Sequence, residues 1–582
     1  MSKHKLSSFK LFLVGVLATY ALCSCGGGEQ TSTNGDPSTG SGAGGTGGTS
    51  GSGGTGGTGG TGGTGSGGSG GGSGTTSPPT TPGTDVVTFK NDVSRTGQNL
   101  TESTLTPTNV NSTTFGLLHN LSVDGKVDAQ PLYLSQLTAG TPAAVHNVVF
   151  VATEGDSVYA FDADTGNPVW QVNLLGSGEV LSDTHGCGQV APNIGITSTP
   201  VIDRAAGAIY VVAMSKDNSS AYHQRLHALN LATGAELFNG PVEITATYPG
   251  TAGGAASSFQ PGQYAERAAL LLSKGVVYTS WTSHCDFPPY SGWIIGYNQS
   301  TLAQAAVLNI GPNSDAGPAI WMSGDGPGAD SAGNIYLLAA NGAFETSLDA
   351  NGFPSKQDFG NSFLKLSASP TLAVVDYFAM SNEVAESNVD QDLGAGGEML
   401  LPDLTDANNT VRHLVVGAGK DGTIYVVDRD SMGKFNANSN NIWQQLTGAL
   451  PGGVFSSPAY FNGAVYYANI GGSLKAFPIT NARLGNASAA QSTSSFPRPG
   501  ASPAVSANGT SNGIIWAHEN SNPAVLHAYD ATNLAHELYN SNQAANNRDH
   551  FGAGNKFITP TIADGKVFVG TQNSVAVFGL LH

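Results

Sequence analysis

Short runs rich in Val, Ile, Tyr and Phe alternate with turns rich in Gly, Asp and Asn from residue 85 to the end of the chain. Val148–Trp170 contains two such runs, an Asp-x-x-Thr-Gly turn and a tryptophan, and Ile209–Phe238 repeats the pattern. Less regular copies follow at Val276–Asn298, Ile335–Leu366, Leu414–Asp428, Val465–Phe477, Ile514–Asp530 and Val567–Phe578. No long stretch shows helical periodicity, so the pattern predicts an all-β protein with an eightfold internal repeat.

The spacing of the copies predicts the architecture. Equivalent positions in the second run of each copy lie 48 to 68 residues apart; they are Ala160, Ala228, Gly296, Leu364, Val426, Ala476, Ala528 and Ala576. Such spacing is typical of a β-propeller with four-stranded antiparallel blades. A short apolar segment precedes each copy, Gly317–Met322 in the fourth, and we expect it to form the innermost strand. We predict an eight-bladed propeller; a seven-bladed ring with one copy misread is the alternative.

The two ends of the repeat region are expected to meet in one blade. The last copy ends at Val575–Leu581 and lacks an outer strand, which Thr114–Val123 can supply. Pairing these segments would close the ring and remove an exposed sheet edge.

The first residues resemble a bacterial lipoprotein signal. Met1–Lys10 carries lysines, Leu11–Leu22 is apolar but too short to span a membrane, and Ser24 precedes Cys25. The resemblance implies a signal peptide over residues 1–24 and lipidation of Cys25. The residue after Cys25 is not Asp, which by the lipoprotein sorting rule favours the outer membrane. An ordinary secretory signal is the alternative.

A low-complexity tether separates this signal from the repeats. Residues 26–84 contain 27 glycines in 59 positions, with Ser, Thr and Pro making up most of the rest, and cannot bury a core. We therefore expect residues 25–84 to be a disordered linker and residues 85–582 to be the propeller. The net charge of −18 and the absence of a basic run argue against nucleic-acid binding.

Only Cys187 and Cys285 lie in the predicted propeller. In an exported protein a lone pair most often forms a disulfide, which we predict here. A zinc site with His185 and His284 is the alternative, but the spacing is unusual. No Cys-x-x-Cys-His motif is present, so the chain has no c-type haem signature.

Asp162-Ala-Asp-Thr-Gly-Asn-Pro-Val-Trp170 resembles the repeat A-x-D-x-x-T-G-x-x-x-W of pyrroloquinoline-quinone (PQQ) propellers. This repeat also occurs in propellers without a cofactor, such as outer-membrane assembly scaffolds. Further motifs resemble the eight-bladed quinoprotein alcohol dehydrogenases, and they lie in Gly317–Trp321, Ile335–Gly342, Asn388–Leu401 and Gly419–Arg429.

This second resemblance implies four site residues. Trp321 would form the floor beneath the PQQ ring, and Asn341 would be a Ca²⁺ ligand. Asp392 would be the catalytic base, and Lys420 would contact the quinone oxygens. An aromatic floor, an oxygen ligand, a carboxylate base and a cation suit hydride transfer from an alcohol to a quinone. Each residue also has a structural interpretation: strand packing, a turn, a loop cap and a hairpin.

The sequence departs from the dehydrogenase pattern in three places. The region of Cys187 has one cysteine where the family has an adjacent pair. The loop between Met214 and Tyr222 contains Asp217, a weak candidate ligand, instead of the family's Glu ligand. Gln391 replaces a tryptophan of the motif that contains the base.

Two functions therefore remain open. The first is an exported, lipid-anchored quinoprotein that binds PQQ and Ca²⁺, oxidises an alcohol-type substrate and passes electrons to a separate acceptor. The second is a non-catalytic propeller that binds a protein or glycan partner at the cell surface. In both cases we expect a monomer attached to the membrane through its lipid.

Overall fold

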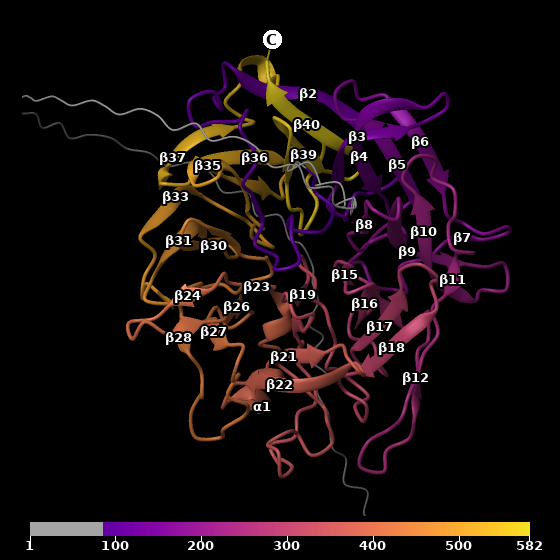
Figure 1. Ribbon diagram of the computed structural model, residues 1–582, viewed down its shortest axis with the longest axis vertical. Helices are drawn as coiled ribbons and strands as arrows, with labels where there is room; N and C mark the ends of the chain where they lie inside the picture. Colours follow the sequence, from indigo (N-terminus) through magenta and orange to yellow (C-terminus); the bar gives the residue numbers. More distant parts are fainter. Residues whose placement is uncertain (1–84, 582) are drawn as a thin grey trace, which may run out of the picture. The chain divides into compact units, whose positions relative to one another are not determined.

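The computed structural model describes residues 85–581. In this range eight sheets, each built on four antiparallel strands, are arranged in a ring (Figure 1), and two further sheets have two strands each. The predicted eight-bladed propeller is confirmed, and the seven-bladed alternative is wrong. The predicted signal peptide (1–24), the lipidation site Cys25 and nearly all of the tether lie outside the described residues.

Blade 1 consists of β3 (Leu132–Ala139), β4 (Ala144–Ala152), β5 (Ser157–Asp162) and β6 (Pro168–Asn173), and blade 2 consists of β8 (Val201–Asp203), β9 (Ala208–Lys216), β10 (Tyr222–Asn230) and β11 (Val242–Glu243). Blade 3 consists of β15 (Leu271–Ser273), β16 (Val276–Ser283), β17 (Trp293–Asn298) and β18 (Gln304–Asn309), and blade 4 consists of β19 (Gly328–Ala329), β20 (Ile335–Leu338), β21 (Ser362–Ser367) and β22 (Ala373–Ala379).

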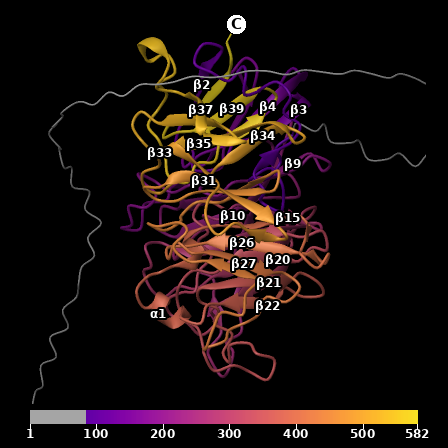
Figure 2. The ribbon, with the colours of Figure 1, turned by 90° about the vertical axis from the view of Figure 1, so that its left-hand side faces the viewer.

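Blade 5 consists of β23 (Glu398–Leu400), β26 (Leu414–Ala418), β27 (Ile424–Asp428) and β28 (Gln444–Leu446), and blade 6 consists of β29 (Ala459–Phe461), β30 (Ala464–Ala468), β31 (Ser473–Thr480) and β33 (Ala490–Ser495). Blade 7 consists of β34 (Ala504–Asn508), β35 (Ser511–Glu519), β36 (Val525–Asp530) and β37 (Asn533–Asn540), and blade 8 consists of β38 (Thr561–Ala563), β39 (Lys566–Gly570), β40 (Ser574–Leu580) and β2 (Phe115–Ser122). From the side, blades 7, 6, 5 and 4 follow one another from top to bottom (Figure 2).

The remaining elements are short. They are β1 (Gln98–Asn99), β7 (Val180–Leu181), β12 (Thr247–Tyr248), β13 (Ser257–Ser258), β14 (Tyr264–Ala265), β24 (Leu404–Thr405), β25 (Val411–Arg412), β32 (Arg483–Leu484), α1 (Glu383–Ser387), η1 (Leu393–Ala395) and η2 (Ala545–Asn547). Between residues 85 and 581, no helix has the length and apolar character needed to cross a bilayer.

The middle strands are buried on both faces because each blade packs between two neighbours. Eight of the nine residues of β9 are buried, whereas β6, an outer strand, has none that is fully buried. Trp170 of β6 reaches the next blade, where its indole N–H donates to the Leu231 carbonyl at 2.9 Å and its ring lies against Gly234. The repeat tryptophan therefore joins two blades, as the PQQ-repeat resemblance implies.

The ring closes as predicted. β2 pairs with β40 in antiparallel register from Phe115 opposite Leu580 to Ser122 opposite Ser574. The first and last strands of the ring thus complete blade 8, and no separate edge is left between the two ends.

The predicted innermost strands are confirmed in seven blades, but the prediction for blade 4 is wrong. Its innermost strand is β19, and Gly317–Met322 lies ahead of it in irregular conformation. The backbone of this segment bonds to three different places: Ile320 N–H to Trp281 O, Ala340 N–H to Ala319 O, and Met322 N–H to Gly394 O. The segment is apolar because it is buried between blades, and a buried run of this length looks like a strand in the sequence.

The segment Val86–Asn99 lies along the inner edges of all eight blades, and the indigo trace crosses the centre of the ring in Figure 1. We call it the hub segment. Backbone bonds join it to blades 1, 2, 4, 5, 6 and 7, and the side chains of Arg95 and Asn99 reach blades 3 and 8. Its partners are Tyr133, Ile202, Leu270, Ala329, Leu400, Tyr460, Val505 and Ile562.

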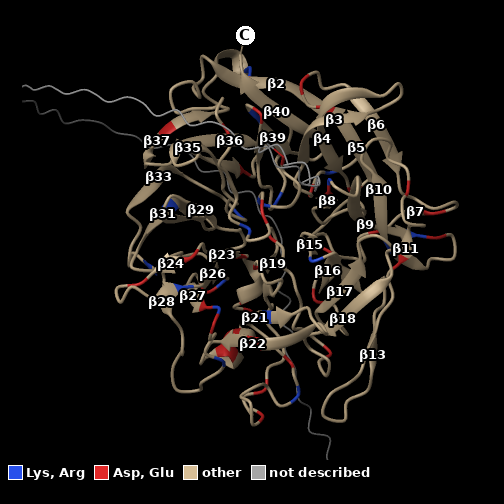
Figure 3. Ribbon diagram, in the orientation of Figure 1, with Lys and Arg blue, Asp and Glu red and all other residues tan. Residues whose placement is uncertain are grey.

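Arg95 is the centre of the hub segment. Its side chain is fully buried and donates to the carbonyls of Phe89, Leu270, Gly326 and Pro327 and to the Thr88 hydroxyl. Asp325 and Glu398 lie close enough to oppose the lowering of the Arg95 pKa that burial causes. Figure 3 shows both basic and acidic residues on the segments nearest the centre of the ring. Arg95 therefore joins the hub segment to blades 3 and 4, with its charge near two buried carboxyl groups.

Replacing Arg95 with Met should destabilise the fold strongly. The change removes the donor to four buried carbonyls, and each buried polar group left unsatisfied costs about 1–3 kcal/mol, so the total loss should be at least about 3 kcal/mol. Denaturant unfolding of the full chain should show a loss of this size. Arg483→Met is the matched control, because the exposed Arg483 side chain contacts the Trp443 ring and carbonyl at the surface, and it should cost about 1 kcal/mol or less. Equal losses would contradict the assigned role.

Candidate functional site

Aromatic rings and cations alternate around one end of the ring axis. Trp321, Phe455 and Phe557 lie in the loops that enter the innermost strands of blades 4, 6 and 8. The Trp321 ring meets the Phe455 and Phe557 rings edge-on, with centroids 5.7 and 6.3 Å apart.

Three cations from blades 3, 5 and 7 flank these rings. Lys420 Nζ lies 5.8 Å from the Trp321 centroid and 5.9 Å from that of Phe455. The Arg498 guanidinium lies 4.7 Å from the Phe455 ring, and that of Arg267 lies 5.2 Å from the Phe557 ring. The end of the axis therefore combines flat apolar surface with positive charge, a combination suited to a planar anion.

The four residues predicted from the dehydrogenase resemblance come together here. Lys420 Nζ lies 5.8 Å from the centroid of the Trp321 ring and 3.7 Å from Asp392 Oδ2. The Asn341 backbone N–H donates to Asp392 Oδ1 at 3.2 Å. Asp390, which the sequence analysis did not single out, joins the group: it pairs with Lys420 at 2.6 Å and accepts from Asn341 Nδ2 at 3.1 Å.

Asn361 holds the loop that carries Asp390 and Asp392. It is fully buried and comes directly before β21. Its side-chain oxygen accepts from the Leu393 N–H at 2.8 Å, and its Nδ2 donates to the Gln391 carbonyl at 3.3 Å. η1 begins directly after Asp392, so the carboxylate is placed by a short, internally bonded turn.

Asp392 is almost completely buried. Burial raises its pKa to about 6, and the Lys420 ammonium and the Asn341 N–H hold it below the value that burial alone would produce. Asp392 is therefore a carboxylate next to a cation, in a region from which most water is excluded.

The oxygen donors fit Ca²⁺ in kind but not in number. Asp390, Asp392 and the side-chain oxygen of Asn341 are the hard ligands that Ca²⁺ prefers, and it takes six to eight of them. Throughout residues 85–581, no group of three or more His, Cys, Asp or Glu side chains is placed to hold a metal ion. Water and oxygens of a bound ligand would have to complete the coordination.

Asp217 does not join this group. It lies in the β9–β10 turn, where its carboxylate accepts from Ser219 and from the Ala221 N–H, and His223 lies 3.7 Å away. It shares no hydrogen bond or ion pair with Asn341 or Asp392 within the part of the chain that the structure describes.

Cys187 and Cys285 form a disulfide that links loops of blades 2 and 3 across 98 residues. The neighbouring His185 and His284 rings stack with centroids 4.2 Å apart. The structure therefore contains the predicted disulfide, and the stacked imidazoles pack beside it without forming a metal-binding group among the described residues.

Sequence reasoning missed Phe455, Phe557, Arg267 and Arg498 because none lies in a recognisable motif. Their common signal is positional: each lies four to six residues ahead of an innermost strand, and Trp321 lies seven residues ahead of β19. Searching the segment just ahead of each innermost strand for aromatic and basic residues would have found them.

These features define an eight-bladed β-propeller with an aromatic and cationic site at one end of its axis. Residues 90–247 match a PQQ-repeat family model described as "Outer membrane protein assembly factor BamB". Together with the eight blades, this match confirms the predicted resemblance to the PQQ-repeat propellers. No curated protein matches the chain.

Several solved structures share the fold. The quinohemoprotein alcohol dehydrogenase of Comamonas testosteroni superposes with a TM-score of 0.55 at 15% identity, over 85% of this chain and 80% of that one. The quinohemoprotein alcohol dehydrogenase ADHIIG of Pseudomonas putida HK5 gives 0.54 at 14% identity, over 86% and 80%. A europium-containing methanol dehydrogenase gives 0.51 at 12% identity, over 86% and 98%. At such identities the likeness shows the fold alone.

Glu266, next to Arg267, should make the stability of the fold depend on pH. Burial raises the pKa of Glu266 to about 8, although the Ser198 hydroxyl donates to it. In the unfolded chain its pKa is about 4.3. Because the folded protein binds the proton more tightly, Glu266 costs no stability below the unfolded pKa and costs progressively more as pH rises towards 8.

Glu266→Gln should therefore raise the midpoint of thermal unfolding more at pH 8 than at pH 5. The corresponding gain in the free energy of unfolding at pH 8 should reach a few kcal/mol, since one pKa unit corresponds to about 1.4 kcal/mol. Glu243→Gln, at an exposed carboxylate, is the control and should show little difference between the two pH values. A gain that is the same at both would refute the assignment.

Proposed function

We propose that this protein is a quinoprotein that binds PQQ at the aromatic and cationic end of its axis and oxidises an alcohol-type substrate. The observation that carries the proposal is the convergence of Trp321, Asn341, Asp392 and Lys420, which are up to 99 residues apart in the sequence. The solved structures with this fold named above include alcohol and methanol dehydrogenases, which supports the same activity class.

The side chains suit the chemistry of PQQ, a flat aromatic quinone that carries carboxylates. The Trp321 ring offers an aromatic surface, and Lys420, Arg267 and Arg498 offer charges for its oxygens. Arg267 is the most telling of these, because it is buried and its Nη2 has no hydrogen-bond partner in residues 85–581. A buried, unsatisfied guanidinium nitrogen is costly, and a carboxylate of a ligand would satisfy it.

Asn341, Asp390 and Asp392 would hold Ca²⁺ beside the quinone. When bound, PQQ supplies a hydride acceptor and Ca²⁺ supplies a Lewis acid. Asp392 would accept the hydroxyl proton of the substrate at a carboxylate oxygen, since it is the buried carboxylate of the group. Lys420 would keep Asp392 ionised and present positive charge to the ligand above Trp321.

The proposal includes a location. A signal peptide over residues 1–24, lipidation at Cys25 and the glycine-rich tether would place the propeller outside the cytoplasm, attached to the outer membrane. Electrons would leave through a separate acceptor. We expect the protein to act as a monomer.

A second candidate is a non-catalytic scaffold that binds a protein or glycan partner. The specific observation in its favour is that the family model matched by residues 90–247 is described as an assembly factor. The cofactor titration below separates the two functions.

Titration of the full chain with PQQ in calcium buffer should quench tryptophan fluorescence saturably, and quinone absorbance should remain with the protein after desalting. Lys420→Gln should weaken binding about 10- to 100-fold, as expected for a lost charge-assisted bond of about 1.5–3 kcal/mol. Lys566→Gln is the matched control, because Lys566 also pairs with an aspartate at 2.6 Å and is similarly buried. If no quinone stays with the protein, or if Lys420→Gln and Lys566→Gln weaken binding equally, the proposed PQQ site is contradicted and the scaffold function is favoured.

Asp392→Asn should separate binding from chemistry. The protein reconstituted with PQQ and Ca²⁺ should reduce an artificial electron acceptor when an alcohol is supplied. Asp392→Asn keeps the shape but removes the base, so turnover should fall at least about 100-fold. Quinone retention after desalting is measured in parallel, and a variant that keeps both PQQ and full turnover would exclude Asp392 as the base.

A further inference from the structure

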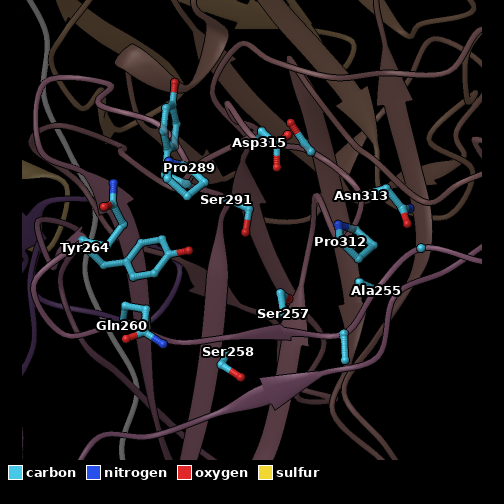
Figure 4. Close-up of a pocket in the computed structure, with 15 residues that line it drawn as sticks. Ala255, Ser257, Ser258, Gln260, Tyr264, Pro289, Ser291, Pro312, Asn313 and Asp315 are labelled. Carbon is cyan, nitrogen blue, oxygen red and sulfur yellow. The ribbon is translucent and has the colours of Figure 1, made fainter.

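A cavity of about 410 Å³ opens on blade 3. Its walls come from the β12–β13 ribbon and the loop into β14, from the loop that follows Cys285, and from the loop ahead of Gly317. In Figure 4, Gln260, Ser258 and Tyr264 lie on one side of the opening, and Ser291 and Asp315 lie across from them. A cavity of this size can hold a small organic ligand.

The lining mixes apolar surface with polar groups that are almost all uncharged. It contains serine hydroxyls, the amides of Gln260 and Asn313, and the rings of Tyr264 and Tyr290. Asp315 is its one ionisable carboxylate, and no Lys, Arg or His lines the cavity. The Tyr264 ring is fixed by stacking on Phe259, with centroids 5.0 Å apart.

Two details indicate that the cavity is built for hydrogen bonding. The Ser257 hydroxyl is buried at the wall and has no partner in residues 85–581. In Figure 4 the Tyr264 hydroxyl points into the opening. The Tyr264 hydroxyl is open to a ligand that can donate and accept hydrogen bonds, and the Ser257 hydroxyl lies unpaired just behind the wall.

The chemistry of the lining selects among ligand classes. An anion would face Asp315 without any cation to pair with it. An apolar ligand would strip water from serine and amide groups without replacing those hydrogen bonds, at a cost of about 1–3 kcal/mol for each group. A sugar carries many neutral hydroxyls and apolar ring faces, and so it matches both the polar atoms and the tyrosine rings.

We propose that this cavity binds a neutral carbohydrate. The site does not depend on PQQ binding, and it adjoins the quinone site. The Tyr290 N–H donates to the Asp315 carbonyl at 3.1 Å. Two residues on, Gly317 lies against the Asn341 carbonyl so closely that a Cβ there would approach it to 2.4 Å. A carbohydrate in the cavity would therefore lie next to the loop of Asn341.

The test is isothermal titration of the full chain, without PQQ, using maltose, cellobiose, glucose and glucuronate. At least one of the two disaccharides should bind saturably in the millimolar range. Glucuronate, which differs from glucose by a carboxylate, should bind less tightly than glucose because Asp315 repels it. Absence of saturable binding for both disaccharides would overturn the proposal.

Variants locate the binding. Asp315→Asn and Gln260→Ala alter exposed side chains and should each weaken binding of the disaccharide about tenfold, as expected for the loss of one good hydrogen bond. Asp315→Asn should also reduce the discrimination against glucuronate. Tyr264→Phe removes the hydroxyl but keeps the ring stacked on Phe259, so it should weaken binding while leaving the unfolding midpoint unchanged.

Asp403→Asn, at an exposed carboxylate of blade 5, is the matched control and should bind the sugar normally. If it weakens binding as much as Asp315→Asn does, the sugar is held elsewhere and the proposal fails. Sugar binding without PQQ binding would refute the quinoprotein function alone, and PQQ binding without sugar binding would refute this inference alone.

Discussion

The inner edges of the eight blades are the constraint on which this structure depends. Each innermost strand turns one row of backbone N–H and C=O groups towards the ring axis, where no further strand of its own sheet can pair with them. The hub segment Val86–Asn99 supplies a partner to each blade in turn. Because it bonds to all eight, it fixes the blades relative to one another and fills the middle of the ring.

The position of the hub segment explains where a ligand site can form. In five blades a site residue precedes the hub contact along the chain: Arg267 comes before Leu270, Trp321 before Ala329, Phe455 before Tyr460, Arg498 before Val505 and Phe557 before Ile562. Lys420 comes instead from the β26–β27 turn of blade 5, which reaches the Trp321 and Phe455 rings. These side chains therefore lie at the end of the axis where the innermost strands begin, beyond the level that the hub segment occupies.

The repeats made the fold predictable, because each copy carries the same strand and turn signals. All eight equivalent positions, from Ala160 to Ala576, lie in the third strand of their blades. The hub segment gave no such signal, since its bonds to each blade are few and follow no period. The prediction that Gly317–Met322 forms a strand was wrong for a related reason. An apolar run indicates that a segment is buried, and here several blades bury it at once without pairing with it as a strand. The convergence of Asn341, Asp392 and Lys420 followed from motif resemblance, whereas Asp390 and the flanking rings required the three-dimensional arrangement.

The hub and the site are joined through buried charge. Asp325, four residues after Trp321, accepts from the Ser457 hydroxyl, two residues after Phe455. Burial raises the pKa of Asp325, while Arg95 and Lys90 of the hub segment lower it. The loops that present the Trp321 and Phe455 rings are thus tied to the same carboxyl group, which lies near the cations of the hub segment. Such support favours a preorganised site, because rings that are already ordered lose little freedom when a ligand binds.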